Sequence, residues 1–230
     1  MNVLLFGASG TIGSGVLLAC QDHPAVTTVR VVGRASLGIS HPKVTEILHK
    51  DFLDFHPIAA QLAGVDAVFW CLGTASSGMT EADYRRITLD YTVAALEVLL
   101  RASPQAVFCF VSGRGTVAPG QKGAMWARVK GEAEARVLAA GFRHAACLRP
   151  GLIYREGGAA PRGLGYRLAY GILDPLRPLM QWMAPGAVTT NRVIGRAMIA
   201  IAQAGEGAPI LECADINALA AAQDAASKAT

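Results

Sequence analysis

The sequence predicts an α/β fold built on a doubly wound parallel sheet. Short apolar runs alternate with helix-like stretches along residues 1–150. The runs are apolar at consecutive positions, which is typical of strands that helices cover on both faces. A glycine-rich turn also follows the first run directly, at the start of a helix-like stretch. The chain has 230 residues, so we expect a single domain over residues 1–230, in which residues 151–230 form a small substrate-side lobe.

The individual elements follow from local composition. Six β-branched or aromatic runs, bounded by Gly, Pro or charged residues, predict strands at residues 3–6, 28–32, 44–48, 67–71, 106–111 and 145–148. The stretches between them predict helices at residues 12–20, 57–62, 81–101 and 124–140. Right-handed crossovers between such strands place the loops that follow them along one edge of the sheet, where we expect a ligand to bind.

The pattern changes after residue 151. Residues 157–165 are loop-like, and residues 166–184 are apolar but broken by proline. Residues 192–203 read as an amphipathic helix, and the alanine-rich residues 218–230 as a final helix with a frayed end. No linker separates a second domain, so we expect this part to pack on the sheet.

Composition excludes several classes of protein. Hydrophobic residues make up 52% and charged residues 17% of the chain, so it can bury a core and is not disordered. No apolar run reaches the length of about 18 residues that a membrane span needs. The net charge of +4 comes from scattered basic residues, so we do not expect nucleic acid as a partner. The first residues lack a basic region and become glycine-rich at once, unlike a signal peptide.

The cysteines predict neither disulfides nor a metal site. There are five, at wide spacings and without a CxxC pair. Cys71, Cys109 and Cys147 lie in apolar runs, where cysteine behaves as a small buried hydrophobe. This usage favours a reducing compartment, and we expect the cytoplasm.

The most informative motif is the turn after the first strand, which reads Gly7-Ala8-Ser9-Gly10-Thr11-Ile12-Gly13. Its first glycine permits a tight turn, the second lets backbone N–H groups approach a pyrophosphate, and the third lets helix and strand pack closely. The helix that begins here adds partial positive charge and free N–H donors. The motif therefore predicts a dinucleotide-binding turn.

The end of the second strand predicts which dinucleotide binds. A site that prefers NAD places Asp or Glu here, to accept hydrogen bonds from the ribose hydroxyls. This chain has Arg34, and the next acidic residue is Glu46. An arginine fork matches a 2′-phosphate, so we expect NADP(H), with a solvated surface arginine as the alternative.

The chain resembles the atypical or extended short-chain dehydrogenases/reductases, and within them the NAD(P)H-binding proteins related to the Tat-interacting oxidoreductase-like proteins. Besides the glycine turn, the segments that carry the resemblance are Val32-Gly33-Arg34, Asp51-Phe52, Cys71-Leu72-Gly73-Thr74, Val111-Ser112-Gly113, Lys130-Gly131-Glu132 and Leu148-Arg149-Pro150-Gly151. They extend over most of residues 1–154.

The resemblance implies a role for each segment at the cofactor. Asp51 and Phe52 correspond to the pair that holds the adenine ring. The segment at residues 71–74 corresponds to the loop whose backbone packs on the adenosine ribose and phosphate. The segment at residues 149–151 corresponds to the motif that approaches the nicotinamide carboxamide. An ordinary strand-end cap, a core aromatic ring and a plain turn are the structural alternatives for these segments.

The resemblance also implies a catalytic group, from which this chain departs. The family uses Tyr and Lys four residues apart on one helix face, with a Ser at the end of the preceding strand. Lys130 is present, Ser112 stands at the strand end, and Trp126 occupies the position of the Tyr. An indole N–H donates a hydrogen bond but does not titrate in the useful range. The resemblance implies that Lys130 also holds the nicotinamide ribose; its alternative is a pair with Glu134 on the helix surface. Trp126 could either pack on the lobe or stack on a substrate.

Other residues could take over the missing role. Tyr84 and Tyr91 belong to the helix after the fourth strand, and Tyr154 lies just past the Pro-Gly turn. Arg114 and Arg128 could bind an anionic substrate. We expect the five histidines at the surface, away from the pocket.

Three functions remain open. The first is an NADP-dependent oxidoreductase or epimerase-like enzyme for a small carbonyl or hydroxyl substrate, with the Tyr replaced by Trp126. The second is a non-catalytic NADPH-binding sensor or regulatory module. The third is a protein that associates with lipid or quinone through the apolar residues 168–185, for which helical core or a dimer face is the alternative. The helices at residues 81–101 and 124–140 are compatible with a homodimer.

Overall fold

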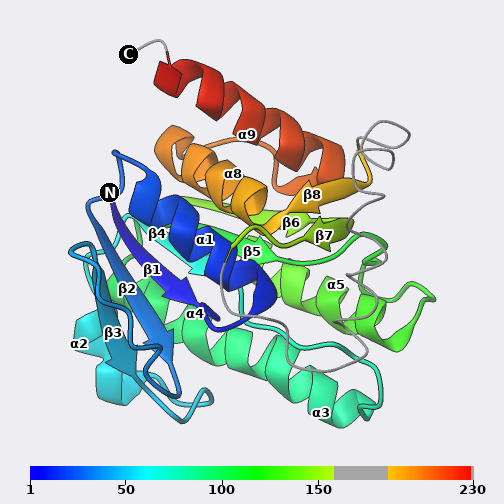
Figure 1. Ribbon diagram of the computed structural model, residues 1–230. Helices are drawn as coiled ribbons and strands as arrows, with labels where there is room; N and C mark the ends of the chain where they lie inside the picture. The colour runs from blue at the N-terminus through cyan, green and yellow to red at the C-terminus, as the bar shows by residue number, and fades with distance from the viewer. Residues whose placement is uncertain (158–185, 229–230) are drawn as a thin grey trace.

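The computed structural model describes residues 1–157 and 186–228, and Figure 1 shows their arrangement. Seven parallel strands form one sheet in the order β3-β2-β1-β4-β5-β6-β9, and β7 and β8 form a separate two-stranded ribbon. The strands are β1 (Asn2–Phe6), β2 (Thr28–Gly33), β3 (Val44–Leu48), β4 (Ala67–Trp70), β5 (Val107–Val111), β6 (His144–Arg149), β7 (Leu152–Tyr154), β8 (Val188–Thr190) and β9 (Ile210–Glu212). This sheet confirms the predicted doubly wound α/β fold.

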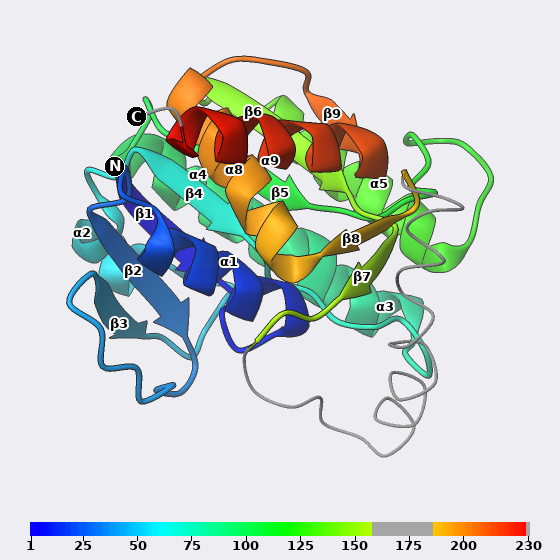
Figure 2. The ribbon, with the colours of Figure 1, turned by 45° about the horizontal axis from the view of Figure 1, so that its top comes forward.

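Helices cover both faces of the sheet. They are α1 (Thr11–Asp22), α2 (Ala59–Leu62), α3 (Glu81–Arg85), α4 (Tyr91–Ala102), α5 (Met125–Leu138), α8 (Asn191–Ala204) and α9 (Cys213–Lys228). A 3₁₀ turn (His56–Ile58) precedes α2, and a π-helical turn (Arg86–Asp90) joins α3 to α4. Figure 2 shows α1, α8 and α9 together on one side of the sheet and α3 to α5 behind it.

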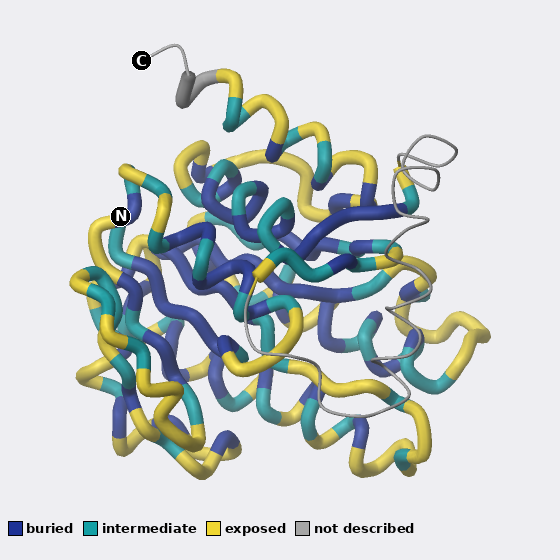
Figure 3. Tube along the Cα trace, in the orientation of Figure 1, coloured by how far each residue is buried: buried dark blue, intermediate teal, exposed yellow. Residues whose placement is uncertain are grey.

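The interior strands of the sheet contribute to two cores, one on each face. In β1, Val3 and Leu5 pack with α1, α8 and α9, whereas Leu4 and Phe6 pack with α2, α4 and α5. All four side chains are fully buried, and Figure 3 shows the strands as the buried interior of the molecule. Because alternate residues point to opposite faces, burial on both faces explains the continuous apolar runs.

The predicted elements differ from the structure where they are short or irregular. The sequence pattern missed β7, β8 and β9, since a three-residue strand is too short to show a periodicity. The helix expected at residues 81–101 contains the π-helical turn, which shifts its register by one residue. The final helix begins at Cys213 rather than at residue 218, so the polar first turn of α9 was also missed.

Several elements of the predicted substrate-side lobe, residues 151–230, extend the main sheet or pack on its helices. Strand β9 pairs with β6 at the edge of the seven-stranded sheet, and α8 packs along α1. Two close contacts set the distance between α1 and α8: a Cβ at Gly15 would lie 2.2 Å from Cγ of Asn191, and a Cβ at Gly195 would lie 2.7 Å from Cβ of Ala19. The apolar segment 168–185 lies outside the described residues. In the part of the chain that is described, no helix has the length and apolar character to cross a bilayer.

Candidate functional site

The glycine turn between β1 and α1 is built by close backbone contacts. Gly7 has a φ of +80°, and the N–H of Gly10 donates a hydrogen bond of 2.9 Å to its carbonyl oxygen. A Cβ at Gly7 would lie 2.5 Å from the carbonyl oxygen of Cys71, and a Cβ at Gly13 would lie 2.1 Å from the carbonyl oxygen of Gly7. No side chain fits at either position, so the chain requires glycine there.

The first turn of α1 faces outward. Ser9, Gly10 and Thr11 are exposed, and among the described residues no side chain caps the helix at Gly10. The first N–H groups of a helix have no partner within the helix and carry partial positive charge. This end of α1 can therefore accept an anionic group.

A cavity of about 310 Å³ opens beside this turn. Its lining comes from the ends of β1, β4 and β5 and from α5, and includes Gly10, Thr11, Leu72, Thr74, Ser112 and Lys130. Strands β1 and β4 are neighbours in the sheet but not in the sequence. Ligands of open α/β sheets bind at this kind of switch point, beyond the carboxyl ends of the strands.

A second cavity, of about 530 Å³, adjoins the first at Ser112, which lines both. Its other lining includes Gly113, Arg114, Pro150 and Gly151. The structure thus brings the glycine turn, the loop after β4, Ser112, Lys130 and the Pro-Gly turn to one edge of the sheet. Ten of the predicted cofactor residues line these two cavities: Gly10, Thr11, Ile12, Cys71, Leu72, Gly73, Thr74, Lys130, Pro150 and Gly151.

Lys130 reaches the first cavity from α5. Its Nζ donates a hydrogen bond of 3.0 Å to the carbonyl oxygen of Val111 and lies 5.4 Å from the ring centroid of Phe110. Burial lowers the pKa of Lys130 to about 8, because the charged ammonium is poorly solvated there. Nζ donates to the Val111 carbonyl rather than to Glu134, whose two carboxylate oxygens accept hydrogen bonds from Arg149, and the nearby charge of Glu134 offsets part of the lowering of the pKa.

Ser112 donates its proton away from the cavities. Its Oγ lies 3.0 Å from Oγ1 of Thr116, and the hydroxyl of Thr116 donates to the carbonyl oxygen of Gly113 at 2.8 Å. A hydroxyl has one proton, so Thr116 must accept from Ser112. In this arrangement Ser112 offers only acceptor lone pairs to a bound molecule.

Trp126 packs on the loop that follows β5. Carbon atoms of its indole ring lie 3.6 Å from the positions that a Cβ would take at Gly113 and at Gly115. Trp126 is partly buried, and it lines neither cavity. The close approach of this loop to α5 also depends on Gly131, where a Cβ would lie 1.8 Å from the carbonyl oxygen of Val117.

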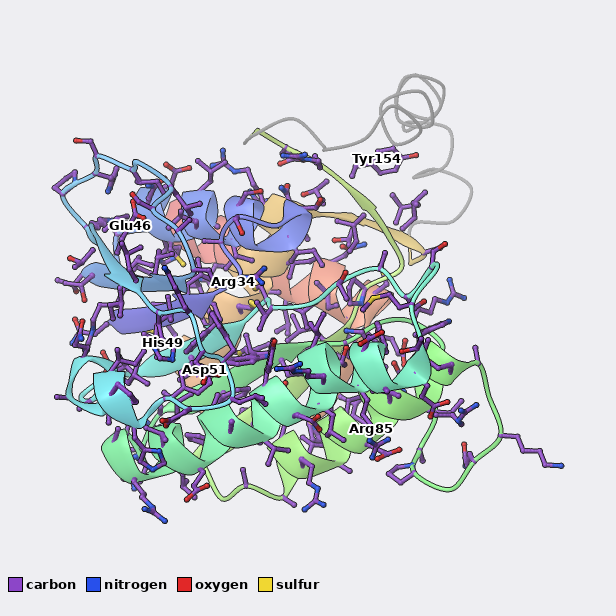
Figure 4. All side chains as sticks on the ribbon, turned by 90° about the horizontal axis from the view of Figure 1, so that it is seen from below. Arg34, Glu46, His49, Asp51, Arg85 and Tyr154 are labelled. Atoms are coloured by element: carbon purple, nitrogen blue, oxygen red, sulfur yellow. The ribbon has the colours of Figure 1, made fainter. Side chains whose placement is uncertain are left out.

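The predicted adenosine residues lie at the ends of β2 and β3. Figure 4 shows Arg34, Glu46, His49 and Asp51 together on this side of the molecule. Arg34 is exposed. Asp51 is also exposed and accepts a hydrogen bond of 2.9 Å from the N–H of Leu53, as a turn cap does. Neither residue lines the two cavities.

Phe52 belongs to the core. Its side chain is only 4% exposed and packs against Phe55 and Tyr91, with ring centroids 5.5 Å and 5.8 Å away. The ring is therefore not available for stacking on adenine, and only the backbone of Phe52 can contact a ligand. The core-aromatic alternative describes this side chain.

The tyrosines named as replacements for the missing Tyr lie elsewhere. Tyr84 and Tyr154 are buried, and Tyr91 packs on Phe52. Within residues 1–157 and 186–228, no tyrosine lines either cavity, and none of the five histidines does. Arg114 lines the second cavity, whereas Arg128 pairs with Glu81 at 2.7 Å. Tyr166 and Tyr170 lie outside the described residues.

The side chain of Arg149 has a structural role that the sequence did not reveal. It pairs with Glu134 at 2.6 Å and with Glu212 at 3.3 Å, which ties β6 to α5 and to β9. The Glu134 side chain is only 4% exposed. Of the segment at residues 149–151, the Pro-Gly turn therefore lines the cavity, while the arginine stabilises the sheet edge.

Asn191 is a further residue that the sequence did not single out. It is fully buried at the start of α8 and contacts the first turn of α1. No local pattern distinguishes it, because its partners are far away in the sequence. Gly131 did have a signal, since an isolated glycine in a helical pattern indicates a close backbone approach.

The described residues contain no group of three His, Cys, Asp or Glu side chains that could hold a metal ion. The five cysteines are free thiols, and four of them are buried. Burial raises the pKa of Cys20 to about 12. The four buried thiols belong to the core, whereas Cys71 is partly buried and lines the first cavity.

Comparison with known proteins relates the chain to two groups. No family model matches it. It is 30% identical over 162 residues to protein fmp52, mitochondrial, from Emericella nidulans, covering 66% of each chain. It is 28% identical over 155 residues to protein HTATIP2 from Rattus norvegicus, covering 66% of this chain and 62% of that protein. The matched segments thus span just under two thirds of the length of these relatives.

Solved structures share the fold. A short-chain dehydrogenase family protein from Francisella tularensis has a TM-score of 0.66 at 12% identity, covering 92% of this chain and 95% of that one. A dTDP-glucose 4,6-dehydratase from Streptomyces venezuelae, solved with NAD and TYD bound, has a TM-score of 0.67 at 17% identity, covering 99% of this chain and 81% of that one. At these identities the likeness establishes the fold alone.

The parallel sheet with a glycine turn at its switch point defines a Rossmann-fold protein. The chain shares this fold with solved short-chain dehydrogenase proteins, and in sequence it is related to the FMP52 and HTATIP2 proteins. The latter relationship confirms the resemblance to the Tat-interacting proteins.

The expected cytoplasmic location is contradicted. The FMP52 relatives from Emericella nidulans, Aspergillus terreus and Saccharomyces cerevisiae are all named mitochondrial. Our expectation rested on cysteine usage alone. Reduced thiols persist in more than one compartment, so cysteine usage could not distinguish between them.

Proposed function

We propose that this protein binds NADP(H) across the two cavities that adjoin at Ser112. The observation that carries the proposal is their common edge: the glycine turn, the loop after β4 and the Pro-Gly turn border one continuous site. The fit is steric as well as electrostatic. Gly7 and Gly13 leave no room for a Cβ and so fix the tight turn, Gly10 lets its backbone approach a pyrophosphate, and the start of α1, which no side chain caps, can neutralise it.

In this proposal each segment holds one part of the cofactor. The turn at residues 7–13 binds the pyrophosphate, and residues 71–74 contact the adenosine ribose and phosphate. Asp51 and the backbone of Phe52 border the adenine, and Pro150 and Gly151 border the nicotinamide. Arg34 selects the 2′-phosphate, because its guanidinium is exposed at the end of β2 and its fork matches phosphate oxygens.

We propose further that the protein is an oxidoreductase or epimerase-like enzyme for a small carbonyl or hydroxyl substrate. The bound nicotinamide would supply or accept a hydride. Lys130 lines the first cavity beside Ser112, where the two cavities adjoin, and with a pKa of about 8 its ammonium can hold and release a proton near neutral pH. Ser112 can position the substrate by accepting a hydrogen bond, and Trp126 keeps the loop after β5 in place.

A specific observation favours a second function, a non-catalytic NADPH-binding sensor. Trp126 stands in place of the Tyr and lies outside both cavities. The proton of Ser112 is also donated to Thr116. Such a protein would keep the cofactor site without the usual proton donor.

Direct binding tests the cofactor assignment. Titration of the full chain with NADPH and with NADH, followed by coenzyme fluorescence, should show tighter binding of NADPH. Arg34→Ala should remove most of that difference, so that the ratio of the NADH Kd to the NADPH Kd falls about tenfold. Equal affinities for both coenzymes in the wild type would overturn the assignment of Arg34, and no binding of either would overturn the proposed cofactor.

Turnover then distinguishes the two functions. We would assay NADPH oxidation with a panel of small aldehydes, ketones and quinones, for the wild type and for Trp126→Tyr. Turnover by the wild type that Lys130→Met abolishes supports the enzyme. Tight NADPH binding without turnover, together with turnover in Trp126→Tyr, supports the sensor.

We also propose a single domain, a homodimer and, as an alternative, association with lipid or quinone. A single domain over residues 1–230 predicts one cooperative unfolding transition. A homodimer through α3 to α5 predicts a mass near 48 kDa, twice the 24.0 kDa of one chain, in sedimentation equilibrium. Association with lipid or quinone predicts co-sedimentation with liposomes that Trp182→Asp reduces, although Trp182 lies outside the described residues.

A further inference from the structure

Glu46 holds the loop that carries Arg34. Glu46 lies on β3, directly opposite Val31 of β2. Its Oε2 accepts a hydrogen bond of 2.7 Å from the N–H of Leu37, and its Oε1 accepts one of 3.1 Å from the N–H of Ile39. The carboxylate therefore holds the backbone of the loop between β2 and β3 by two hydrogen bonds, and we call this pair of hydrogen bonds the clasp. Figure 4 shows Arg34 and Glu46 on the same side of the molecule.

The loop has little other support. Residues 34–38 are exposed, so packing contributes little to their order, and Ile39 at the end of this stretch is partly buried against the core. Within the loop, the N–H of Gly38 donates to Oγ of Ser36 at 3.0 Å, and Gly38 has a φ of +66°. Strand β3 is also the edge of the sheet. Among the described residues, Glu46 provides the side-chain hydrogen bonds that tie this loop to the sheet.

The clasp also keeps Glu46 from binding the ribose hydroxyls of a coenzyme. In an NAD-preferring site an acid near the end of β2 accepts hydrogen bonds from the ribose hydroxyls. Both carboxylate oxygens of Glu46 are directed at backbone N–H groups instead. These hydrogen bonds hold the pKa of Glu46 below its usual value, so the carboxylate stays charged while it is bound to the loop.

We propose that Glu46 is a positioning residue for coenzyme selection, which acts by holding the Arg34 loop in the conformation that receives the 2′-phosphate. The proposal rests on the proposed NADP(H) site. Fixing a loop before binding lowers the entropy lost on binding. Glu46 should therefore strengthen binding of ligands with a 2′-phosphate and leave other ligands unaffected.

The test compares Glu46→Gln with the wild type by calorimetric titration of NADPH, NADH and adenosine 2′,5′-bisphosphate. The side-chain amide of Gln carries an NH₂ group, which would face one of the two backbone N–H groups. Two donors cannot form a hydrogen bond with each other, so one of the two hydrogen bonds to the loop is lost. We expect the Kd for NADPH and for the bisphosphate to rise about five- to tenfold, and the Kd for NADH to change less than about twofold. Glu97→Gln removes the same charge from an exposed helix position and should change none of these values.

A double variant shows whether Glu46 acts through Arg34. In the Arg34→Ala background, Glu46→Gln should cause no further loss of NADPH affinity, since the group it positions is gone. If the double variant loses NADPH affinity by the product of the factors seen in the two single variants, the proposal is overturned. A Glu46→Gln variant with unchanged NADPH affinity would also overturn it. Failure of the wild type to bind either coenzyme would instead overturn the proposed function.

A measurement on the wild type keeps the proposal testable if Glu46→Gln does not fold. The clasp predicts that the amides of Leu37 and Ile39 exchange hydrogen slowly in the free protein, although the loop is exposed. The neighbouring amide of Ala35 serves as the reference. Equal, fast exchange at all three positions would show that the clasp is absent and would overturn the proposal.

Discussion

The side-chain amide of Asn191 donates a hydrogen bond of 3.0 Å to the carbonyl oxygen of Thr11, which lies 180 residues earlier in the chain. The Oδ1 atom of Asn191 accepts a hydrogen bond of 2.8 Å from the N–H of Glu156. One fully buried side chain thus joins the first turn of α1 to the loop after β7. Gly15 makes room for it, since any Cβ there would overlap it. The candidate site and the C-terminal part of the chain are physically connected at this point.

The first prediction concerns this connection. Asn191→Ala removes both hydrogen bonds and empties a fully buried position, which should lower the free energy of unfolding by about 1–3 kcal/mol. It should also weaken NADPH binding, because the start of α1 loses a support. Urea denaturation and coenzyme titration measure the two effects. Asn2→Ala is the matched control: it removes an exposed hydrogen bond from Thr28 and should cost less than about 1 kcal/mol.

The second prediction separates two glycines of the turn. Gly13→Ala places a methyl group 2.1 Å from the carbonyl oxygen of Gly7, so it should lower stability by about 2 kcal/mol or more and abolish dinucleotide binding. At Gly10 the nearest atom would be 3.3 Å away. Gly10→Ala should therefore fold nearly normally and lose only affinity. Equal stability losses in the two variants would contradict this difference.

The third prediction concerns the pair between Glu134 and Arg149. Glu134→Gln leaves the mostly buried guanidinium with a weaker partner, and should lower the free energy of unfolding by about 3 kcal/mol. Glu212→Gln removes a half-exposed carboxylate from the same guanidinium and should cost less than about 1 kcal/mol. Because both acids lie outside the cavities, neither variant should change the ratio of the NADPH and NADH dissociation constants.

The fourth prediction concerns the pH dependence that Lys130 imposes. Burial lowers its pKa from 10.5 to about 8 in the folded protein. Below pH 8 the folded protein therefore bears the full cost of the buried charge. Between about pH 8 and 10.5 the unfolded chain binds more protons than the folded protein, so stability rises with pH.

Lys130→Met isolates this effect. The stability of the wild type relative to Lys130→Met should rise by on the order of 3 kcal/mol between pH 7 and pH 10.5. Urea denaturation of both proteins across this range gives the difference, in which other titrating groups cancel. A difference that stays constant with pH would show that Lys130 is not perturbed.

The sequence alone predicted most of the sheet, and the reason is local. Strands β1, β2, β4, β5 and β6 lie buried between two helix layers, so consecutive residues in them are apolar. The glycine turn was equally visible, because its steric demands fall within seven residues. Arg34 and Ser112 could be placed because each follows a strand directly, and the topology fixes where strand ends lie.

Other features of the site depended on contacts between distant segments. The sequence could not show that Phe52 points into the core, that Arg149 pairs with Glu134, or that Ser112 donates its proton to Thr116. Each of these depends on which side chain lies opposite, and a local pattern does not contain that information.

The sequence by itself determined the fold class, the position of the glycine turn and the absence of a Tyr four residues before Lys130. Only the tertiary structure decided that Glu46 holds the Arg34 loop, that Asn191 supports α1, and that Lys130 lies partly buried with a lowered pKa. The physical reason is the range of the interactions. Periodicity and turn sterics act over a few residues, whereas desolvation and hydrogen-bond pairing depend on the whole packed chain.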